Sequence, residues 1–175
     1  MIAKTYSSKL FKLPIIITRF ANIWGPGQLN FTALIPDLMR SCILDQKFEM
    51  RGNGESTRDY IHINDIVDIY KLLSKKLYLS PKKYTGEIFN AGTSVPHRTK
   101  DVLKKIFLYR KKNKELKKVI NSMKNNKTSG ELSVQYMDYK KLYKYFRWKP
   151  KRKFEKMIPS VYEWYENFFN NLKKK

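Results

Sequence analysis

Cysteine, glycine, proline and acidic residues are all scarce in this 175-residue sequence. The single cysteine, Cys42, cannot form a disulfide within the chain, which excludes a small secreted scaffold held together by disulfides. Seven glycines and seven prolines are too few for a collagen-like or low-complexity chain. A hydrophobic content of 42% is too high for a disordered polycation. These absences leave a globular chain.

Long hydrophobic runs are missing as well. The longest run, residues 13–17, has the length of a strand, whereas a membrane-spanning helix needs about 18 apolar residues. The first residues include Lys4 and Lys9 but no apolar stretch before a small-residue cleavage site, so no secretion signal is visible. We therefore expect a soluble, cytoplasmic protein with no membrane segment.

The sequence is strongly basic, with 37 Lys and Arg against 15 Asp and Glu and a formal net charge of +22. The excess is uneven: residues 1–97 hold 13 basic and 8 acidic residues, whereas residues 98–175 hold 24 and 7. Lysines that neutralise phosphates favour nucleic-acid binding. The recognition of bases relies on arginine, however, and arginine is scarce here because lysines outnumber arginines 29 to 8. The abundance of Lys, Asn and Ile also matches A/T-rich codons. We expect solvated helix faces and no specific nucleic-acid partner.

Apolar spacing predicts strands that alternate with helices along the chain. The β-branched run at 15–20 is typical of a strand buried on both faces of a parallel sheet. Helices are expected at 1–12, 32–44, 64–79, 99–110, 114–123, 138–146 and 154–171, with Thr32, Asn64 or Asp65, and Thr99 as N-caps. Further strands are expected at 48–51, 60–63, 87–90 and 132–136, and a polar loop at 124–130. The fold class is α/β with a partly parallel sheet and no second independent domain.

Familiar catalytic motifs are missing from the sequence. No G-x-x-x-x-G-K-[ST] or G-x-G-x-x-G stretch occurs, and one cysteine with two histidines gives no metal-ligand spacing. Tyr6 and Lys9 are one residue too close for the Tyr-x-x-x-Lys pair of short-chain dehydrogenases, so Tyr6 is interpreted as a packing residue. Cys42 is expected in the core, His62 on the outward side of a strand and His97 in solvent. We assign no catalytic residue and no metal site.

Two segments carry polar residues that suit a binding site. Residues 18–26 take a buried strand into a Gly-Pro loop, and Asn22 follows that strand, where ligands of open α/β sheets lie. Residues 51–65 form a glycine-rich stretch that contains Arg58, whose guanidinium suits a diphosphate. Structural roles remain open for both residues, with Asn22 as a loop former and Arg58 as the partner of Asp59 or Asp65.

Together, these segments resemble the C-terminal half of the extended short-chain dehydrogenase/reductases, the NAD-dependent sugar-nucleotide epimerases and dehydratases. The matching motifs lie, in chain order, at residues 18–26, 52–65, 89–92, 146–150 and 163–165. Residues 27–31 and 34–36, with Gln135 and Tyr136, look most like the CDP-glucose 4,6-dehydratases. The resemblance implies the C-terminal part of a Rossmann-like parallel sheet together with a smaller α/β substrate-binding lobe.

The resemblance also implies which parts of the enzyme lie elsewhere. The Tyr-x-x-x-Lys motif would precede Met1 and the glycine-rich NAD-binding half would lie further upstream, so that residues 1–175 are the C-terminal half of the domain. In complete enzymes NAD oxidises the sugar at C4, an acid/base pair removes water across C5–C6, and the hydride returns to C6. NAD is therefore the implied cofactor, although its main binding motif is not in this chain and its contacts here are unknown.

Carried over residue by residue, the resemblance implies three substrate-binding residues for a nucleotide sugar. Asn22 would contact a phosphate or the sugar, Leu34 would lie against the nucleotide, and Arg58 would bind the diphosphate. The sequence departs from the family at three positions. Ile23 stands where some relatives carry an Asn that contacts the nicotinamide, and Trp24 stands where a Tyr is usual. Ala33 stands where relatives often carry a basic or polar residue that faces the substrate.

Three functions follow as expectations. The first is the substrate-binding half of a sugar-nucleotide 4,6-dehydratase-like protein, most similar to the CDP-glucose enzymes, as a fragment or remnant that is inactive and folds poorly alone. The second is one half of a split enzyme that needs a separate N-terminal chain, with a homodimer as a further possibility for assembly. The third is a basic polyanion-binding protein.

Overall fold

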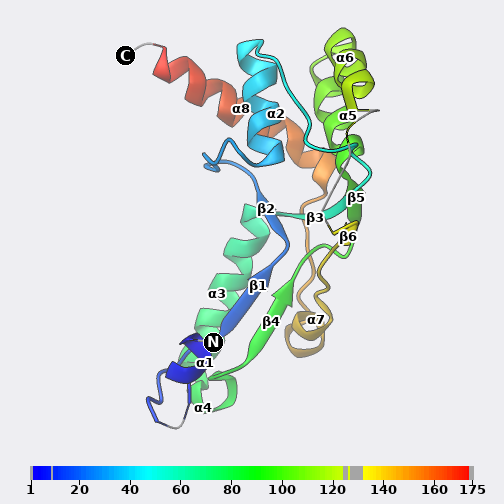
Figure 1. Cartoon of the computed structure of the whole chain (residues 1–175). Helices are drawn as coiled ribbons and strands as arrows, with labels where there is room; N and C mark the ends of the chain where they lie inside the picture. Colours follow the sequence, from blue (N-terminus) through cyan, green and yellow to red (C-terminus); the bar gives the residue numbers. More distant parts are fainter. Residues whose placement is uncertain (1, 9, 124–125, 127–131, 174–175) are drawn as a thin grey trace.

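The protein consists of two groups of elements placed end to end (Figure 1). The structure is a computed structural model that describes residues 2–8, 10–123, 126 and 132–173. One group surrounds the strands β1 (Ile17–Phe20) and β4 (Ile88–Ala91), and the other contains the helices α2 (Leu34–Leu44), α5 (Thr99–Tyr109), α6 (Asn113–Met123) and α8 (Phe154–Leu172). Each group buries its own set of apolar side chains. The expected α/β class is confirmed.

The first group is built on the parallel pair β1 and β4, with Ile17 opposite Ile88 and Phe20 opposite Ala91. Helix α3 (Ile63–Leu79) runs alongside this pair (Figure 1) and buries Ile66 and Ile69. Helix α7 (Lys140–Phe146) adds Leu142 to the same core. The short helices α1 (Ile2–Tyr6) and α4 (Pro81–Tyr84) lie at the far end of the pair.

Strand β3 (Thr57–His62) joins the two groups. Its last three residues pair in parallel with β2 (Asn22–Trp24). Its first residues pair with two short strands, antiparallel with β5 (Pro96–Arg98) and parallel with β6 (Val134–Gln135). Directly after His62 the chain enters α3, so one continuous segment links the small sheet to the parallel pair.

Most of the predicted helices are confirmed, because their apolar stripes face the two cores. Helices α2, α3, α5, α6 and α8 cover almost the same residues as the sequence predicts. The predicted N-caps are wrong: α2 and α5 begin after Ala33 and Arg98 without a side-chain cap. The predicted strands at 15–20, 60–63, 87–90 and 132–136 appear in shorter or shifted form as β1, β3, β4 and β6.

Two other predictions are wrong, and a short strand was missed. The predicted strand at 48–51 is an extended segment without strand pairing, and Phe48 packs beside Phe107 in the helical core. The predicted helix at 1–12 ends at Tyr6, and its apolar residues Ile2 and Leu10 are exposed. Strand β5 was missed because its first residue is a proline. The predicted loop at 124–130 lies, apart from Asn126, outside the described residues.

His62 corrects another expectation, because its side chain is buried rather than turned outward. The Nδ1 atom accepts a hydrogen bond from the backbone N–H of Asn64 at 3.2 Å and so caps the first turn of α3. Its ring meets that of Trp24 edge-on, with 5.4 Å between the ring centres. Burial lowers the pKa of His62, which favours the neutral ring that this cap requires.

The buried carboxylate of Asp59 on β3 holds two other segments in place. It accepts hydrogen bonds from the backbone N–H of Thr93 (2.9 Å), Ser94 (3.3 Å) and Met137 (3.3 Å), and from the Thr93 hydroxyl (2.5 Å). Gly92 passes so close that a Cβ there would lie 2.3 Å from the Asp59 carboxylate. The loop after β4 and the segment before α7 are therefore both fixed to β3.

No helix among the described residues is both long enough and apolar enough to cross a membrane.

Replacing Asp59 with Asn should lower the free energy of unfolding by about 2–4 kcal/mol, because the buried donors lose a charged acceptor and face an amide N–H₂ instead. Urea unfolding followed by circular dichroism measures this change. Glu163, which is exposed on α8, provides the control, since Glu163→Gln should change stability by less than about 0.5 kcal/mol. Equal stability of the two variants would contradict the role of Asp59.

Candidate functional site

An open cleft of about 760 Å³ lies between the small sheet and the helical group. It is bounded by β2, by the loop that follows β2 and the first turns of α2, by the extended segment 48–51, and by β3. Ser56, Arg58 and Tyr60 all line it, because alternate residues of an extended chain point to the same side. The position after the end of β2 is one where ligands of open α/β sheets bind.

All three predicted substrate-binding residues line this single cleft. Asn22 comes from β2, Leu34 is the first residue of α2, and Arg58 comes from β3. The sequence places these residues up to 36 positions apart (22 to 58), and the fold brings them to the same cavity. Their binding roles remain predictions.

Arg58 is already engaged at the edge of the cleft. Its Nη1 atom donates to the backbone oxygens of Thr57 (2.9 Å) and Leu132 (2.8 Å). The sequence offered Asp59 and Asp65 as alternative partners of Arg58, but both carboxylates accept from other donors. Asp59 accepts from the segments described above. Asp65 accepts from the Arg152 guanidinium and from the backbone N–H of Lys151 and Arg152. Arg58 therefore has a backbone anchor that fixes its position on the wall.

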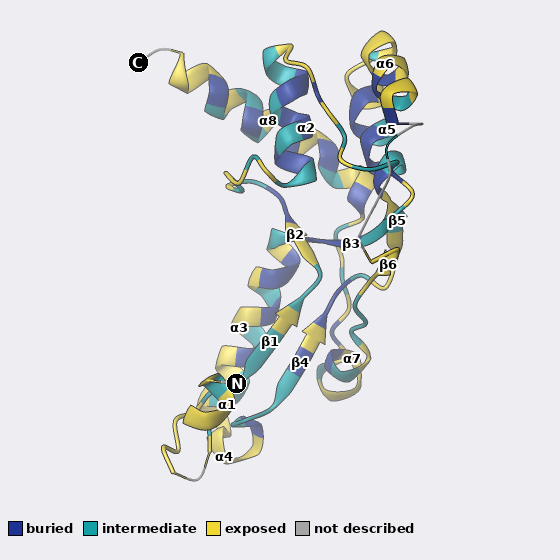
Figure 2. Cartoon of the chain, viewed as in Figure 1, coloured by how far each residue is buried: buried dark blue, intermediate teal, exposed yellow. Residues whose placement is uncertain are grey.

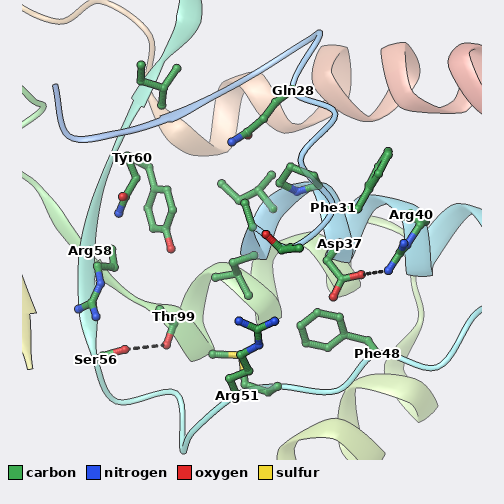
Figure 3. A pocket seen from close by; sticks show the side chains of 18 of the residues that line it. Gln28, Phe31, Asp37, Arg40, Phe48, Arg51, Ser56, Arg58, Tyr60 and Thr99 are labelled. Atoms are coloured by element: carbon green, nitrogen blue, oxygen red, sulfur yellow. Dashed lines mark hydrogen bonds and ion pairs between the residues drawn. The ribbon is translucent and has the colours of Figure 1, made fainter. Parts of the chain in front are cut away.

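Arg51 is a candidate binding residue that the sequence analysis missed. Its guanidinium extends from the segment 48–51 into the open part of the cleft (Figure 3). Within the described part of the chain it has no hydrogen bond or ion pair, so its five N–H groups are available to an anionic ligand. The assignment of 48–51 to a strand hid this role, although an arginine directly before a glycine turn is a usable signal.

The cleft also holds neutral polar groups. The Tyr60 hydroxyl and the Gln28 amide both point into it (Figure 3). Burial raises the pKa of Tyr60 to about 12, so its hydroxyl keeps its proton at neutral pH and remains able to donate a hydrogen bond. The backbone oxygen of Gln28 accepts from the hydroxyl of Tyr165 at 2.5 Å, which ties the loop after β2 to α8.

The wall formed by α2 carries an ion pair. Asp37 and Arg40, three residues apart on the helix, approach to 2.5 Å between Oδ1 and Nη2. The Arg40 guanidinium lies over the ring of Phe31, at 5.3 Å from its centre. The cleft therefore combines cationic, acidic and aromatic groups, a mixture that suits a ligand with a charged end and a flat end.

Cys42 and His97 lie outside the cleft. Cys42 is buried in the helical core as predicted, and burial raises the pKa of its thiol to about 11, so the thiol is unreactive at neutral pH. His97, predicted in solvent, is half-buried against Phe154 with 5.3 Å between the ring centres. Burial and the nearby Lys105 ammonium lower the pKa of His97. Neither residue is placed for catalysis in this cleft.

Two glycine turns of the described chain have packing roles within the protein. Gly25 and Gly54 have positive φ angles, but added Cβ atoms would collide with Ile63 and with Met123, so protein packing accounts for both glycines. Neither glycine lies in a turn that leads directly from a strand into a long helix. Among the described residues, no group of three or more His, Cys, Asp or Glu side chains is arranged to hold a metal ion.

Comparisons with known proteins agree on one family. A protein-family model described as GDP-mannose 4,6 dehydratase matches residues 1–161. The dTDP-D-glucose 4,6-dehydratase of Homo sapiens is 26% identical over 165 residues, which are 93% of this chain and 45% of that protein. The UDP-glucose 4-epimerase of Mycoplasma genitalium is 28% identical over 179 residues, which cover 94% of this chain and 50% of that protein.

The fold is similar to solved structures of the same kind. The dTDP-glucose 4,6-dehydratase of Bacillus anthracis, solved in complex with NAD, superposes with a TM-score of 0.72 at 27% sequence identity. The superposition covers 95% of this chain and 49% of that one. The chain thus spans about half the length of the relatives that it matches along most of its own length.

Tyr60 should make the fold sensitive to alkaline pH. Because its pKa is higher in the folded chain than the ordinary value of 10.0, the unfolded state ionises first, and stability is lost as the pH rises from about 10 to 12. At pH 11 this loss amounts to about 1 kcal/mol for Tyr60. Urea unfolding at pH 8 and pH 11 should show a smaller alkaline loss for Tyr60→Phe than for the unmodified chain. An identical loss in both would contradict the burial of this hydroxyl.

Proposed function

Because the chain belongs to the GDP-mannose 4,6-dehydratase family of NAD-dependent sugar-nucleotide dehydratases and epimerases, we propose that it is the substrate-binding half of such an enzyme. The ligand of the cleft is a nucleoside diphosphate sugar, with CDP-glucose as the substrate favoured by the sequence resemblance. The observation that carries the proposal is the convergence of Asn22, Leu34 and Arg58, from three different elements, on one cleft together with Arg51.

The diphosphate is the group that the arginines suit best. A guanidinium binds phosphate oxygens through two parallel N–H donors and keeps its charge at all physiological pH values. Arg51 reaches into the open cleft, and Arg58 stands on the opposite wall (Figure 3). The Asn22 amide can donate to a phosphate or sugar oxygen from the start of β2. Leu34 supplies an apolar surface for the nucleotide.

The chemical step belongs to groups that the cleft does not contain. NAD, when bound, supplies the oxidation of the sugar, and the family resemblance puts its main binding motif in the other half of the domain. Tyr60 is the one tyrosine among the described residues that line the cleft, and Asn64 stands four positions after it, so the cleft holds no Tyr-x-x-x-Lys pair for proton transfer. The second half of the domain, on the same or another polypeptide, supplies both.

The parallel pair offers a place for that second half. Of the strands described, only β4 pairs with β1, which leaves the other edge of β1 without a neighbour. The large apolar residues of the preceding segment are exposed (Figure 2), namely Ile2, Tyr6, Leu10, Phe11 and Leu13. Such a surface needs a cover, and a parallel strand with its helix from the missing half provides one. A split enzyme, in which this half is a separate chain, is the second form of the proposal.

Removing the Arg51 guanidinium should weaken nucleoside diphosphate binding by about 10- to 100-fold, because one charge-assisted contact is lost. Isothermal titration calorimetry with CDP measures the Kd of Arg51→Ala, and Arg51→Lys should lose less affinity because it keeps the charge. Arg19→Ala is the control, since Arg19 is exposed on β1 and lies outside the cleft. Equal Kd values for Arg51→Ala and Arg19→Ala would refute the role of Arg51.

Residues 1–175 alone should bind the nucleotide sugar without converting it. Incubation with CDP-glucose and NAD, followed by chromatography, should give no 4-keto-6-deoxy sugar. Addition of an N-terminal half from a family member, with its glycine-rich loop and Tyr-x-x-x-Lys pair, should restore product formation if the two halves associate. Turnover by residues 1–175 alone would contradict this division of labour.

A further inference from the structure

Asp37 places a carboxylate in the cleft, where an anionic ligand would not favour it. Its Oδ1 atom is bound by Arg40 at 2.5 Å, and its second oxygen faces the open part of the cavity (Figure 3). The side chain is 26% exposed, so it is largely screened from bulk water. An acid beside a diphosphate site costs affinity through repulsion, unless it faces a different part of the ligand.

The surroundings of Asp37 fix its direction. The Arg40 guanidinium that holds Oδ1 is itself stacked over Phe31, and its Nε atom is buried with no hydrogen-bond partner in the described part of the structure. Phe31 and Phe48 stand on either side of the Asp37 carboxylate in Figure 3. A flat ring that enters between these aromatic residues would meet the free oxygen of Asp37 with its edge.

We propose that Asp37 selects the base of the bound nucleotide by accepting a hydrogen bond from an exocyclic amino group. The inference rests on the proposed function, because it assigns the aromatic, acidic end of the cleft to the base and the arginine end to the diphosphate. Arg40 is a positioning residue, since it holds the carboxylate in the orientation that leaves Oδ2 free. The preferred ligands are nucleotides with an amino-bearing base, of which cytosine is the smallest.

The chemistry of the base edges explains the selection. A carboxylate only accepts hydrogen bonds. Cytosine presents an N4 amino donor at the position where uracil and thymine present an O4 acceptor, so the carboxylate attracts the first and repels the others. The N3–H of uracil is a donor, but carbonyl oxygens flank it on both sides and would face the carboxylate. A polar site that matches one base leaves unpaired groups with the other, which is an effective source of discrimination.

CDP and UDP provide the sharpest test, because they differ only at this edge of the base. Isothermal titration calorimetry of the chain should give a Kd for CDP at least 10-fold lower than for UDP. Asp37→Asn should weaken CDP binding about 10-fold and leave UDP binding unchanged or stronger, because the amide offers a donor to O4. Asp45→Asn removes the carboxylate of the residue that caps the C-terminus of α2, outside the cleft, and should preserve the preference. Urea unfolding checks that each variant is folded.

The outcomes separate the inference from the proposed function. If neither nucleotide binds, the proposed function is wrong and the inference falls with it. If both bind with equal Kd, or UDP binds more tightly, the cleft is a nucleotide site but Asp37 does not select the base. An equal loss of CDP and UDP affinity in Asp37→Asn would also overturn the inference, since it would show a structural role. As a second variant, Arg40→Gln should reduce the preference for CDP while retaining UDP binding.

Discussion

The buried carboxylate of Asp59 is the constraint on which the cleft depends. Strand β3 is only six residues long, yet it pairs with three other strands and continues directly into α3. Asp59 uses the side of β3 away from the cleft to fix the loop after β4 and the segment before α7. Because neighbouring residues of a strand point to opposite sides, anchoring Asp59 also orients Arg58 and Tyr60 toward the cleft. A single charged group thus couples the two cores and sets one wall of the candidate site.

The helices were predictable from the sequence because burial determines them. Each of α2, α3, α5, α6 and α8 turns a periodic apolar stripe toward a core, and such a stripe is visible without any structure. The ends of the helices were less predictable, since the caps depend on contacts outside the helix. His62 is the clearest example: its cap on α3 requires a buried ring held beside Trp24, 38 positions earlier in the chain (62 against 24).

The candidate site was predictable only in part, for a related reason. Asn22, Leu34 and Arg58 were found through a resemblance between motifs, and the structure gathers them in one cleft. Asp37 was missed because nothing in its local sequence distinguishes it from a surface charge, and Arg51 was missed because the segment 48–51 was assigned to a strand. Their importance comes from the direction of their side chains in the folded chain. For Arg51 that direction follows from the segment 48–51, which is extended but makes no strand pairs. Apolar spacing alone had assigned this segment to a strand.

The basic C-terminal region takes on a different meaning in the folded chain. Some of its lysines pair with acids on other elements, as Lys105 does with Glu155 and Lys112 with Asp45. The binding of a specific anion is instead proposed for two arginines of the less basic half, Arg51 and Arg58. A polyanion-binding role for the lysine-rich helices remains a separate prediction, with a strong dependence on salt as its signature.

The location of a bound nucleotide tests the central claim most directly. A crystal structure of the chain with CDP should show the diphosphate between the guanidinium of Arg51 and the amide of Asn22, with the base between Phe31 and Phe48. Electron density for CDP on the lysine-rich surface of α6, with an empty cleft, would contradict the account.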